Sequence, residues 1–274
     1  MSHTIGIYTK DHPVLRTQRD ARVHLAGASN TPAAYSLEQF EAVILDQGPT
    51  SSCIGHGTAQ GVFTSFAAAG RPLAWTPSPK VIYDLARILN RGSPADGLQD
   101  NGAMPAFAIA ALGGFGVTAM LALSPDGRNS DVTPDDVNTE PSFLELEDSG
   151  LKLVTGEFRV DETSSTFGEQ ITAAISGSSG KAPCSVCIGA FVDTQNFMAY
   201  DGSTPITTIN VNDPQGGGHW FVLSYYYDDP ALGLVLGGPG SWGTSYGKNG
   251  HHEITASALQ AVTSDCYLMN VGGQ

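Results

Sequence analysis

The chain has 274 residues, of which 41% are hydrophobic and 15% are charged, so it can bury a full core and is not globally disordered. Its 33 glycines and 16 prolines favour many turns and β-structure over a helical bundle. It carries 27 Asp and Glu against 13 Lys and Arg, a net charge of −14. That charge argues against sequence-independent binding to nucleic acid and against docking on an acidic membrane.

Neither the N-terminus nor the longest uncharged run carries a secretion or membrane signal. The first residues, Met1 to Thr4, lack the basic and apolar regions of a signal peptide. The run from Asn101 to Pro125 is interrupted by Pro105 and several glycines, and it predicts a buried helix, a turn and a strand. Four cysteines in a chain of this length do not make a disulfide scaffold. We expect a soluble protein made in a reducing compartment.

The first strong local signal is a turn-rich stretch, residues 46–53, that leads into an apolar segment. One side of that segment repeats every four residues: Ile54, Thr58, Val62 and Phe66. This spacing predicts a helix over residues 54–69, with Ser51 or Ser52 as its cap and Gly70 at its end. Cys53 is therefore expected in the first turn of a buried helix.

Two further helices are predicted in the first half. Ser78 is a typical N-cap and Pro79 suits the first helical position, so a helix is expected from Val81 to Leu89. Another covers about Pro105 to Leu112. From Asp126 to Asp148 the chain is acidic, and we interpret this stretch as a solvated connector.

The second half changes to short strands between glycine-rich turns. The expected strands cover residues 151–154, 156–160, 183–191, 220–227, 232–236 and 252–255, and one helix covers 168–175. Helices followed by antiparallel strands are typical of an α+β fold. We divide the chain into a leader, residues 1–40, a helical half, residues 41–150, and a β half, residues 151–274, within one domain.

Cys53 and His219 are the candidate nucleophile and base. A cysteine at a helix N-terminus has its thiolate stabilised by the positive end of the helix dipole, and Gln47 and two serines make the approach to it polar. His219 follows three glycines and leads an apolar strand, although a histidine merely hydrogen-bonded at a strand end is the alternative. The loop of residues 240–250 contains Trp242 and spaced glycines, a pattern equally typical of a tight surface turn.

Together these three segments resemble the papain-like cysteine peptidases. The spacing from Gln47 to Cys53 matches the glutamine and nucleophile of that family, and Gly218-His219 before an apolar strand resembles its histidine segment. Residues 241–250, which begin Ser-Trp-Gly-Thr, are similar to its third segment. The resemblance covers residues 41–260 and implies a papain-like α+β fold, with the active-site cleft between a helical half and an antiparallel β half.

This resemblance implies a role for each of five residues. Cys53 is expected to be the nucleophile, His219 the base that forms an ion pair with it, and Gln47 a donor in the oxyanion hole. Gly102 is expected to approach the substrate backbone, and Trp242 to shield the histidine from water. Donors aimed at the oxyanion contribute about 3–4 kcal/mol. No metal or organic cofactor is implied.

Three departures from the family pattern bear on activity. Gly240 stands where the resemblance places an asparagine that orients the histidine, so another group or water must orient it and a loss of rate is expected. Ile54 and Thr50 replace the usual aromatic residue and disulfide cysteine, and these changes weigh less. Residues 1–40 are shorter than the usual inhibitory pro-region. Either the enzyme is made active, or the leader blocks the cleft, or there is little activity to restrain.

Other residues with chemical potential have simpler interpretations. Cys184 and Cys187 have the spacing of metal ligands but lack a second pair, so we expect core packing. His251 and His252 point to opposite sides of a strand and are interpreted as surface residues. His56 either competes with the base beside Cys53 or packs under the loop. The glycine-rich stretches lack the ending of a phosphate loop.

The main functional hypothesis is hydrolysis of peptide or isopeptide bonds in a polypeptide through a Cys53 thioester. One rival is a catalytically weak or inactive module, bound to other protein subunits in a larger assembly such as a phage particle. A second rival is a cell-wall peptide amidase or endopeptidase, against which the Ser-Trp-Gly segment argues. The expected location is the cytoplasm or the inside of a virus or phage particle.

Overall fold

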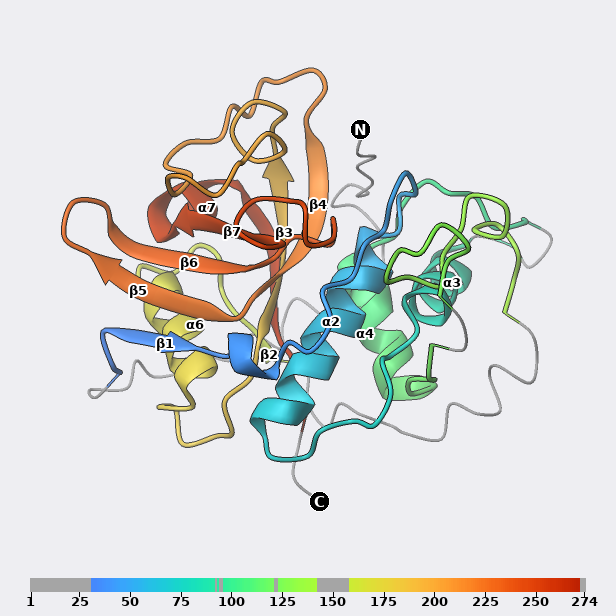
Figure 1. The fold of residues 1–274 in the computed structure, drawn as a ribbon, viewed down its shortest axis with the longest axis horizontal. Helices are drawn as coiled ribbons and strands as arrows, with labels where there is room; N and C mark the ends of the chain where they lie inside the picture. The colour runs from blue at the N-terminus through green and yellow to red at the C-terminus, as the bar shows by residue number, and fades with distance from the viewer. Residues whose placement is uncertain (1–30, 92, 94–95, 121–122, 142–157, 272–274) are drawn as a thin grey trace.

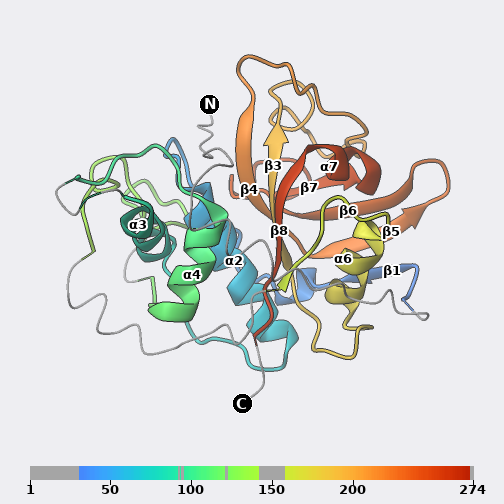
Figure 2. The ribbon, with the colours of Figure 1, turned by 180° about the vertical axis from the view of Figure 1, so that it is seen from behind.

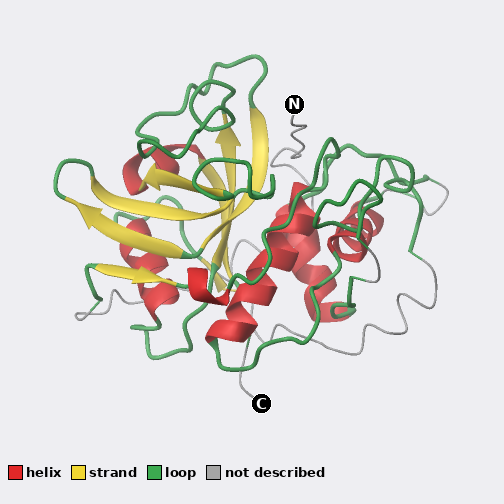
Figure 3. Cartoon of the chain, in the orientation of Figure 1, coloured by secondary structure: helices red, strands yellow, loops and turns green. Residues whose placement is uncertain are grey.

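The computed structural model describes residues 31–91, 93, 96–120, 123–141 and 158–271. Within these ranges the chain forms two halves that lie side by side, one helical and one built mainly of β-sheet (Figures 1 and 3). The predicted α+β arrangement is therefore confirmed. No helix among the described residues has the length and apolar character needed to cross a bilayer.

The helical half contains α2 (Cys53–Ala68), α3 (Pro79–Asn90) and α4 (Pro105–Gly114), and each begins and ends within two residues of its predicted bounds. Figure 2 shows α2 and α4 next to each other from behind. The start of α3 is as predicted, because Ser78 Oγ accepts a hydrogen bond from the Val81 N–H at 3.0 Å.

The start of α2 differs from the prediction. Ser52 occupies the N-cap position, but its side chain makes no capping hydrogen bond. Its hydroxyl lies 2.6 Å from Thr50 Oγ1 and 3.1 Å from His56 Nδ1 instead. Ser52 therefore occupies the predicted N-cap position, but its hydroxyl contacts the preceding turn and the His56 side chain. It does not accept a hydrogen bond from the backbone N–H groups at the start of the helix.

The β half contains two four-stranded sheets, both built from antiparallel pairs. One sheet has the order β1 (Ala34–Ser36), β5 (Tyr225–Asp229), β6 (Gly233–Pro239) and β7 (His251–Thr255). The other has the order β2 (Phe158–Arg159), β8 (Thr263–Leu268), β3 (Val186–Val192) and β4 (Gly217–Leu223). A short 3-10 helix η1 (Glu38–Phe40) and helices α6 (Phe167–Ser176) and α7 (Ala256–Val262) complete the described elements.

One strand prediction needs correction, and three elements were not predicted. The single strand expected over residues 220–227 is two strands in different sheets, because the first strand ends before Ser224. The Ser224 N–H donates to Gly237 O, and its carbonyl accepts from the Leu37 N–H. The pattern also missed β1, α7 and β8. The strand predicted over residues 151–154 lies outside the described residues.

Part of the predicted acidic connector is buried rather than solvated. Ser130 and Val132 are fully buried, and Val132 belongs to the core cluster around α2. Asp131 accepts hydrogen bonds from Ser78 Oγ at 2.5 Å and from the Lys80 N–H at 3.0 Å. These hydrogen bonds attach the connector to the start of α3. The Asp131 carboxylate is therefore hydrogen-bonded to protein groups, whereas the prediction for this stretch was contact with solvent.

Helix α2 is buried on nearly every side, whereas the sequence predicted one apolar face. Three of its glycines allow other elements to approach closely. A Cβ added at Gly55 would lie 2.2 Å from Pro79 O of α3, and one at Gly57 would lie 2.7 Å from Trp220 Cδ1 of β4. At Gly61 it would lie 2.6 Å from Cys187 Sγ of β3. The central helix is therefore in contact with both halves of the fold.

This close packing makes a prediction for Gly57→Ala. In a helix interior alanine is normally better than glycine by about 0.5–1 kcal/mol, but overpacking against Trp220 costs about 1–3 kcal/mol. We expect a lower free energy of unfolding for Gly57→Ala in urea titrations. Gly113→Ala in α4 is the matched control, because its Cβ meets nothing within 4 Å, and it should be neutral or stabilising. Equal effects of the two substitutions would contradict the packing argument.

Candidate active site

Cys53 is the first residue of α2 and is fully buried. The turn before it is held by its own polar groups. Gln47 Nε2 donates to Thr50 O at 2.7 Å, and Thr50 Oγ1 donates to Gln47 O at 2.8 Å. Gly48 has a φ of 56°, a left-handed conformation that glycine adopts without strain. These hydrogen bonds close a turn from Gln47 to Thr50, and Cys53 follows it three residues later as the first residue of α2.

A second network links this turn to Gly102. The Ser51 N–H donates to Asp100 Oδ1 at 3.0 Å, and the Tyr83 hydroxyl donates to the same oxygen at 2.9 Å. That hydroxyl in turn accepts from the Gly102 N–H at 3.0 Å. Gly102 has a φ of 83°, which favours glycine. Asp100 and Tyr83 therefore connect the predicted substrate-binding glycine to the turn that precedes the proposed nucleophile.

His219 lies in β4 and is fully buried. Its Nε2 is 3.0 Å from the Gly240 carbonyl oxygen, and its ring stacks on Trp242 with centroids 4.4 Å apart and planes 14° apart. A carbonyl oxygen can only accept, so the Nε2 atom must carry the proton of this hydrogen bond. In the neutral ring Nδ1 is then the nitrogen that can accept a proton.

The loop that follows Gly240 contacts both the segment before Cys53 and the ring of His219. The Gln47 N–H donates to Ser241 O at 2.9 Å, and the Gly243 N–H donates to Leu45 O at 3.1 Å. On the other side, Trp242 covers the His219 ring. Below them, Trp220 Nε1 of β4 donates to Thr58 Oγ1 of α2 at 3.0 Å. The helix that begins with Cys53 and the strand that carries His219 are thus packed together, and one loop contacts both His219 and the segment that leads into the helix.

His56 does not have the bonding of a rival base. Its Nδ1 lies 3.0 Å from Ser52 O, which can only accept, so Nδ1 carries a proton. Its Nε2 lies 2.8 Å from Ser130 Oγ, so that hydroxyl donates to it. Burial lowers the pKa of His56 to about 4. The side chain is therefore a neutral structural histidine, as in the second of the two interpretations.

The other three cysteines are all buried in the core. Burial raises the pKa of Cys184 to about 12 and raises those of Cys187 and Cys266 as well. Cys184 and Cys187 pack in different hydrophobic clusters, which supports core packing over a shared metal. Within the described residues, no group of three or more His, Cys, Asp and Glu side chains is arranged to hold a metal ion.

His251 and His252 point to opposite sides of β7, but the prediction that they are surface residues was wrong. His251 Nε2 lies 2.6 Å from Glu41 Oε2; burial lowers its pKa, yet the Glu41 carboxylate outweighs this and the net pKa is raised. His252 is fully buried with its ring centroid 4.6 Å from that of Phe221. Burial lowers its pKa well below the usual value. His251 is therefore held by the Glu41 carboxylate, and His252 by packing against Phe221 of β4.

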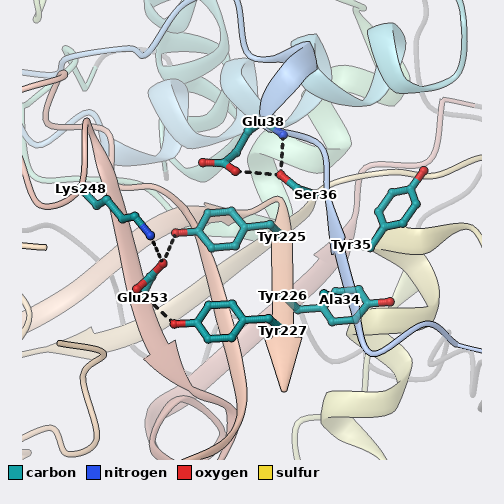
Figure 4. A pocket seen from close by; sticks show the side chains of 9 residues that line it. All are labelled: Ala34, Tyr35, Ser36, Glu38, Tyr225, Tyr226, Tyr227, Lys248 and Glu253. Carbon is teal, nitrogen blue, oxygen red and sulfur yellow. Dashed lines mark hydrogen bonds and ion pairs between the residues drawn. The ribbon is translucent and has the colours of Figure 1, made fainter. Parts of the chain in front are cut away.

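An open pocket of about 350 Å³ lies apart from these residues and is lined mainly by side chains of β1, β5 and β7 (Figure 4). Its wall contains the buried carboxylate of Glu253, which accepts hydrogen bonds from the Tyr225 hydroxyl at 3.1 Å and from Lys248 Nζ at 3.0 Å. The Tyr227 hydroxyl donates to its other oxygen at 3.3 Å. The carboxylate is satisfied by its own wall, and none of the candidate catalytic residues lines the pocket.

The neutral state of His56 predicts a pH dependence of stability. Below pH 6.5 the unfolded chain binds a proton at this residue and the folded chain does not, so the free energy of unfolding falls as the pH drops towards 4. One histidine contributes at most about 1.4 kcal/mol per pH unit. In His56→Gln, urea titrations should show a shallower loss between these pH values. An unchanged slope would contradict a neutral His56.

No protein-family model and no curated protein matches this sequence. Among solved structures, xylellain, a cysteine protease from Xylella fastidiosa, is similar with a TM-score of 0.71 and 18% identity, over 98% of this chain and 96% of that one. Procathepsin L 3 of Tenebrio molitor gives 0.64 and 16%, over 91% and 74%. The cysteine protease CMS1MS2 of Carica candamarcensis gives 0.58 and 15%, over 88% and 100%. The chain therefore has the papain-like cysteine protease fold.

Proposed function

We propose that the chain is a cysteine peptidase that hydrolyses peptide bonds in polypeptides through a thioester at Cys53. The observation that carries the proposal is the bonding of His219. Its Nε2 proton is directed to Gly240 O, which makes Nδ1 the proton acceptor, and its strand packs against the helix that Cys53 begins. The papain-like fold of the chain agrees with this assignment.

In the first step His219 Nδ1 takes the proton of the Cys53 thiol. The thiolate lies at the positive end of α2, and the imidazolium is opposite in charge, so both favour the ionised thiol. The sulfur then adds to the carbonyl carbon of the substrate, and the carbonyl oxygen becomes an oxyanion. The amide nitrogen of Gln47 and the backbone N–H of Cys53 are the proposed donors to that oxygen.

In the second step the C–N bond breaks, and the amine leaves with the proton from His219 Nδ1. The acyl group stays on Cys53 as a thioester. A water molecule then gives a proton to His219 Nδ1 and adds to the thioester carbon. Collapse of this intermediate releases the carboxylic acid product and returns the sulfur as thiolate, so no external oxidant, reductant or cofactor takes part.

Gly102 and Trp242 are proposed to support the Cys53–His219 pair, Gly102 by contacting substrate and Trp242 by excluding water. The Gly102 N–H is bonded to Tyr83, so its carbonyl is the group that would contact a substrate backbone. Trp242 covers one face of the imidazole and keeps water from it. A dry environment strengthens the attraction between thiolate and imidazolium.

The proposal predicts a selective, pH-insensitive thiolate at Cys53. At about pH 6 an ordinary thiol is almost wholly protonated, whereas Cys53 should be labelled by iodoacetamide at the same rate there as at neutral pH. The three other cysteines are matched internal controls, because they are equally buried but have raised pKa values. The rate at each cysteine is followed by mass spectrometry, and the ultraviolet absorbance of the thiolate is measured in parallel because it needs no access for a reagent.

The variant His219→Ala should abolish the low-pH plateau of Cys53 in both measurements, and Cys53→Ala should remove the absorbance step. Retention of the plateau in His56→Gln would show that His219 rather than His56 is the base. Four cysteines that react only as the pH approaches about 8.5 would mean an unactivated thiol, and the peptidase proposal would be rejected in favour of a binding role.

A further inference from the structure

The Gly240–Ser241 peptide holds both ends of the proposed catalytic machinery. The Gly240 carbonyl accepts from His219 Nε2 at 3.0 Å, and the next carbonyl, that of Ser241, accepts from the Gln47 N–H at 2.9 Å. Two consecutive carbonyl groups therefore bind the base and the residue proposed for the oxyanion hole. Both acceptors are backbone carbonyl oxygens, so the residue types at positions 240 and 241 do not indicate these hydrogen bonds.

Residue 240 has no room for a side chain. A Cβ added there would lie 2.6 Å from Tyr246 Cε1 and 2.9 Å from Tyr246 Cδ1, distances that real Cβ atoms do not show. The Tyr246 ring is itself held, because its hydroxyl donates to Phe197 O at 2.8 Å and its ring meets Trp242 edge-on at 4.8 Å. Any acceptor that residue 240 offers to His219 must therefore be the backbone carbonyl.

The conformation of this peptide is maintained against a steric cost. Ser241 has a φ of 63°, which is uncommon for a residue with a side chain and costs of order 1 kcal/mol. Hydrogen bonds on both sides fix the loop: the Gly240 N–H donates to Gly250 O at 3.0 Å, and the Gly250 N–H donates to Tyr246 O at 2.7 Å. The surrounding structure holds Ser241 in a conformation that directs the two carbonyls to their partners.

We propose that the Gly240 carbonyl, held in place by Tyr246, is the positioning group that fixes the ring of His219 and its Nε2–H tautomer, in place of an orienting side chain. Its importance for a reaction rests on the peptidase proposal above, but the positioning itself does not. Glycine at 240 is then a requirement of this site rather than the loss of an orienting residue. Tyr246 and Gly240 form a matched pair in which the ring occupies the space that a side chain at 240 would need.

The tautomer of His219 is measured first, in a Cys53→Ala background where no ion pair can form. Long-range proton–nitrogen NMR correlations, recorded at a pH where the imidazole is neutral, should show one tautomer with the proton on Nε2. Gly240→Ala in the same background should give a mixture of tautomers, because the new methyl group moves the peptide away from the ring. A proton on Nδ1, or an even mixture before Gly240 is changed, would overturn the proposal whether or not the chain is a peptidase.

The matched pair is tested by a double-mutant cycle on the rate of Cys53 labelling at low pH. Gly240→Ala should slow this labelling by about tenfold to a hundredfold, the usual effect of misplacing a reacting group by about an ångström. In a Tyr246→Ala background the same substitution should cost about twofold or less, because the clash is gone. Equal costs in the two backgrounds would overturn the role given to Tyr246.

Two further variants separate positioning from a general loss of structure. Gly113→Ala is the control for adding a methyl group, since it meets nothing, and should leave both the tautomer and the labelling unchanged. Gly240→Asn restores the side chain expected from the family pattern but should lose as much as Gly240→Ala. Labelling of Gly240→Asn at the wild-type rate or faster would overturn the proposal. Absence of a low-pH plateau in the unchanged protein, with the Nε2–H tautomer present, would instead reject the peptidase proposal alone.

Discussion

The close approach of helix α2 to strand β4 is the constraint on which the site depends. Gly57 lets the helix backbone come within side-chain contact of Trp220, and the indole of that residue donates to Thr58 one residue further along the helix. His219 precedes Trp220 in the same strand. The contact of Trp220 with α2 therefore determines the position of His219 along the axis of the helix that Cys53 begins. A methyl group at Gly57 would change the separation of the two halves, and with it the relation of the proposed nucleophile to its base.

Around this contact, backbone carbonyl groups are the acceptors that hold the proposed catalytic side chains and the turn before Cys53. The turn before Cys53 is closed by carbonyl acceptors of Gln47 and Thr50, and the base is held by the carbonyl of Gly240. Backbone groups have little conformational entropy left to lose once the loop is formed, so they hold a ring more rigidly than a long side chain can. The cost moves to the loop, where Ser241 adopts a left-handed conformation.

The sequence predicted most of the helical half because its signals there are local. Ser78 with Pro79 determines where α3 starts. The four-residue repeat from Ile54 to Phe66 predicts the position of α2, although α2 is buried on more than the one face that the repeat marks. Cys53 and His219 were predicted from their neighbours along the chain, which is again local information. The division of residues 220–227 into two strands depends on long-range partners of Ser224, namely Leu37 and Gly237, and no local pattern contains them.

The errors at polar residues have the same physical origin. His251 was predicted to lie at the surface and Asp131 to lie in a solvated connector, but each is hydrogen-bonded to a partner distant in sequence, Glu41 for His251 and Ser78 for Asp131. The acceptor for His219 was unpredictable for a different reason. Gly240 has no side chain, so its chemistry at this site is the direction of one carbonyl, which only the packing of Tyr246 and the hydrogen bonds of the loop determine.

The surroundings of each ring, rather than distance along the chain, distinguish the proposed base from His56 and His252. His56 is only three residues from Cys53, but a carbonyl at one nitrogen and a donating hydroxyl at the other keep it neutral and occupied. His252 lies among aromatic rings, where protonation is disfavoured by the lack of water. His219 combines an accept-only partner at Nε2 with a stacked indole, a combination that fixes which nitrogen exchanges the proton. The fold therefore selects one histidine by the partners that it provides.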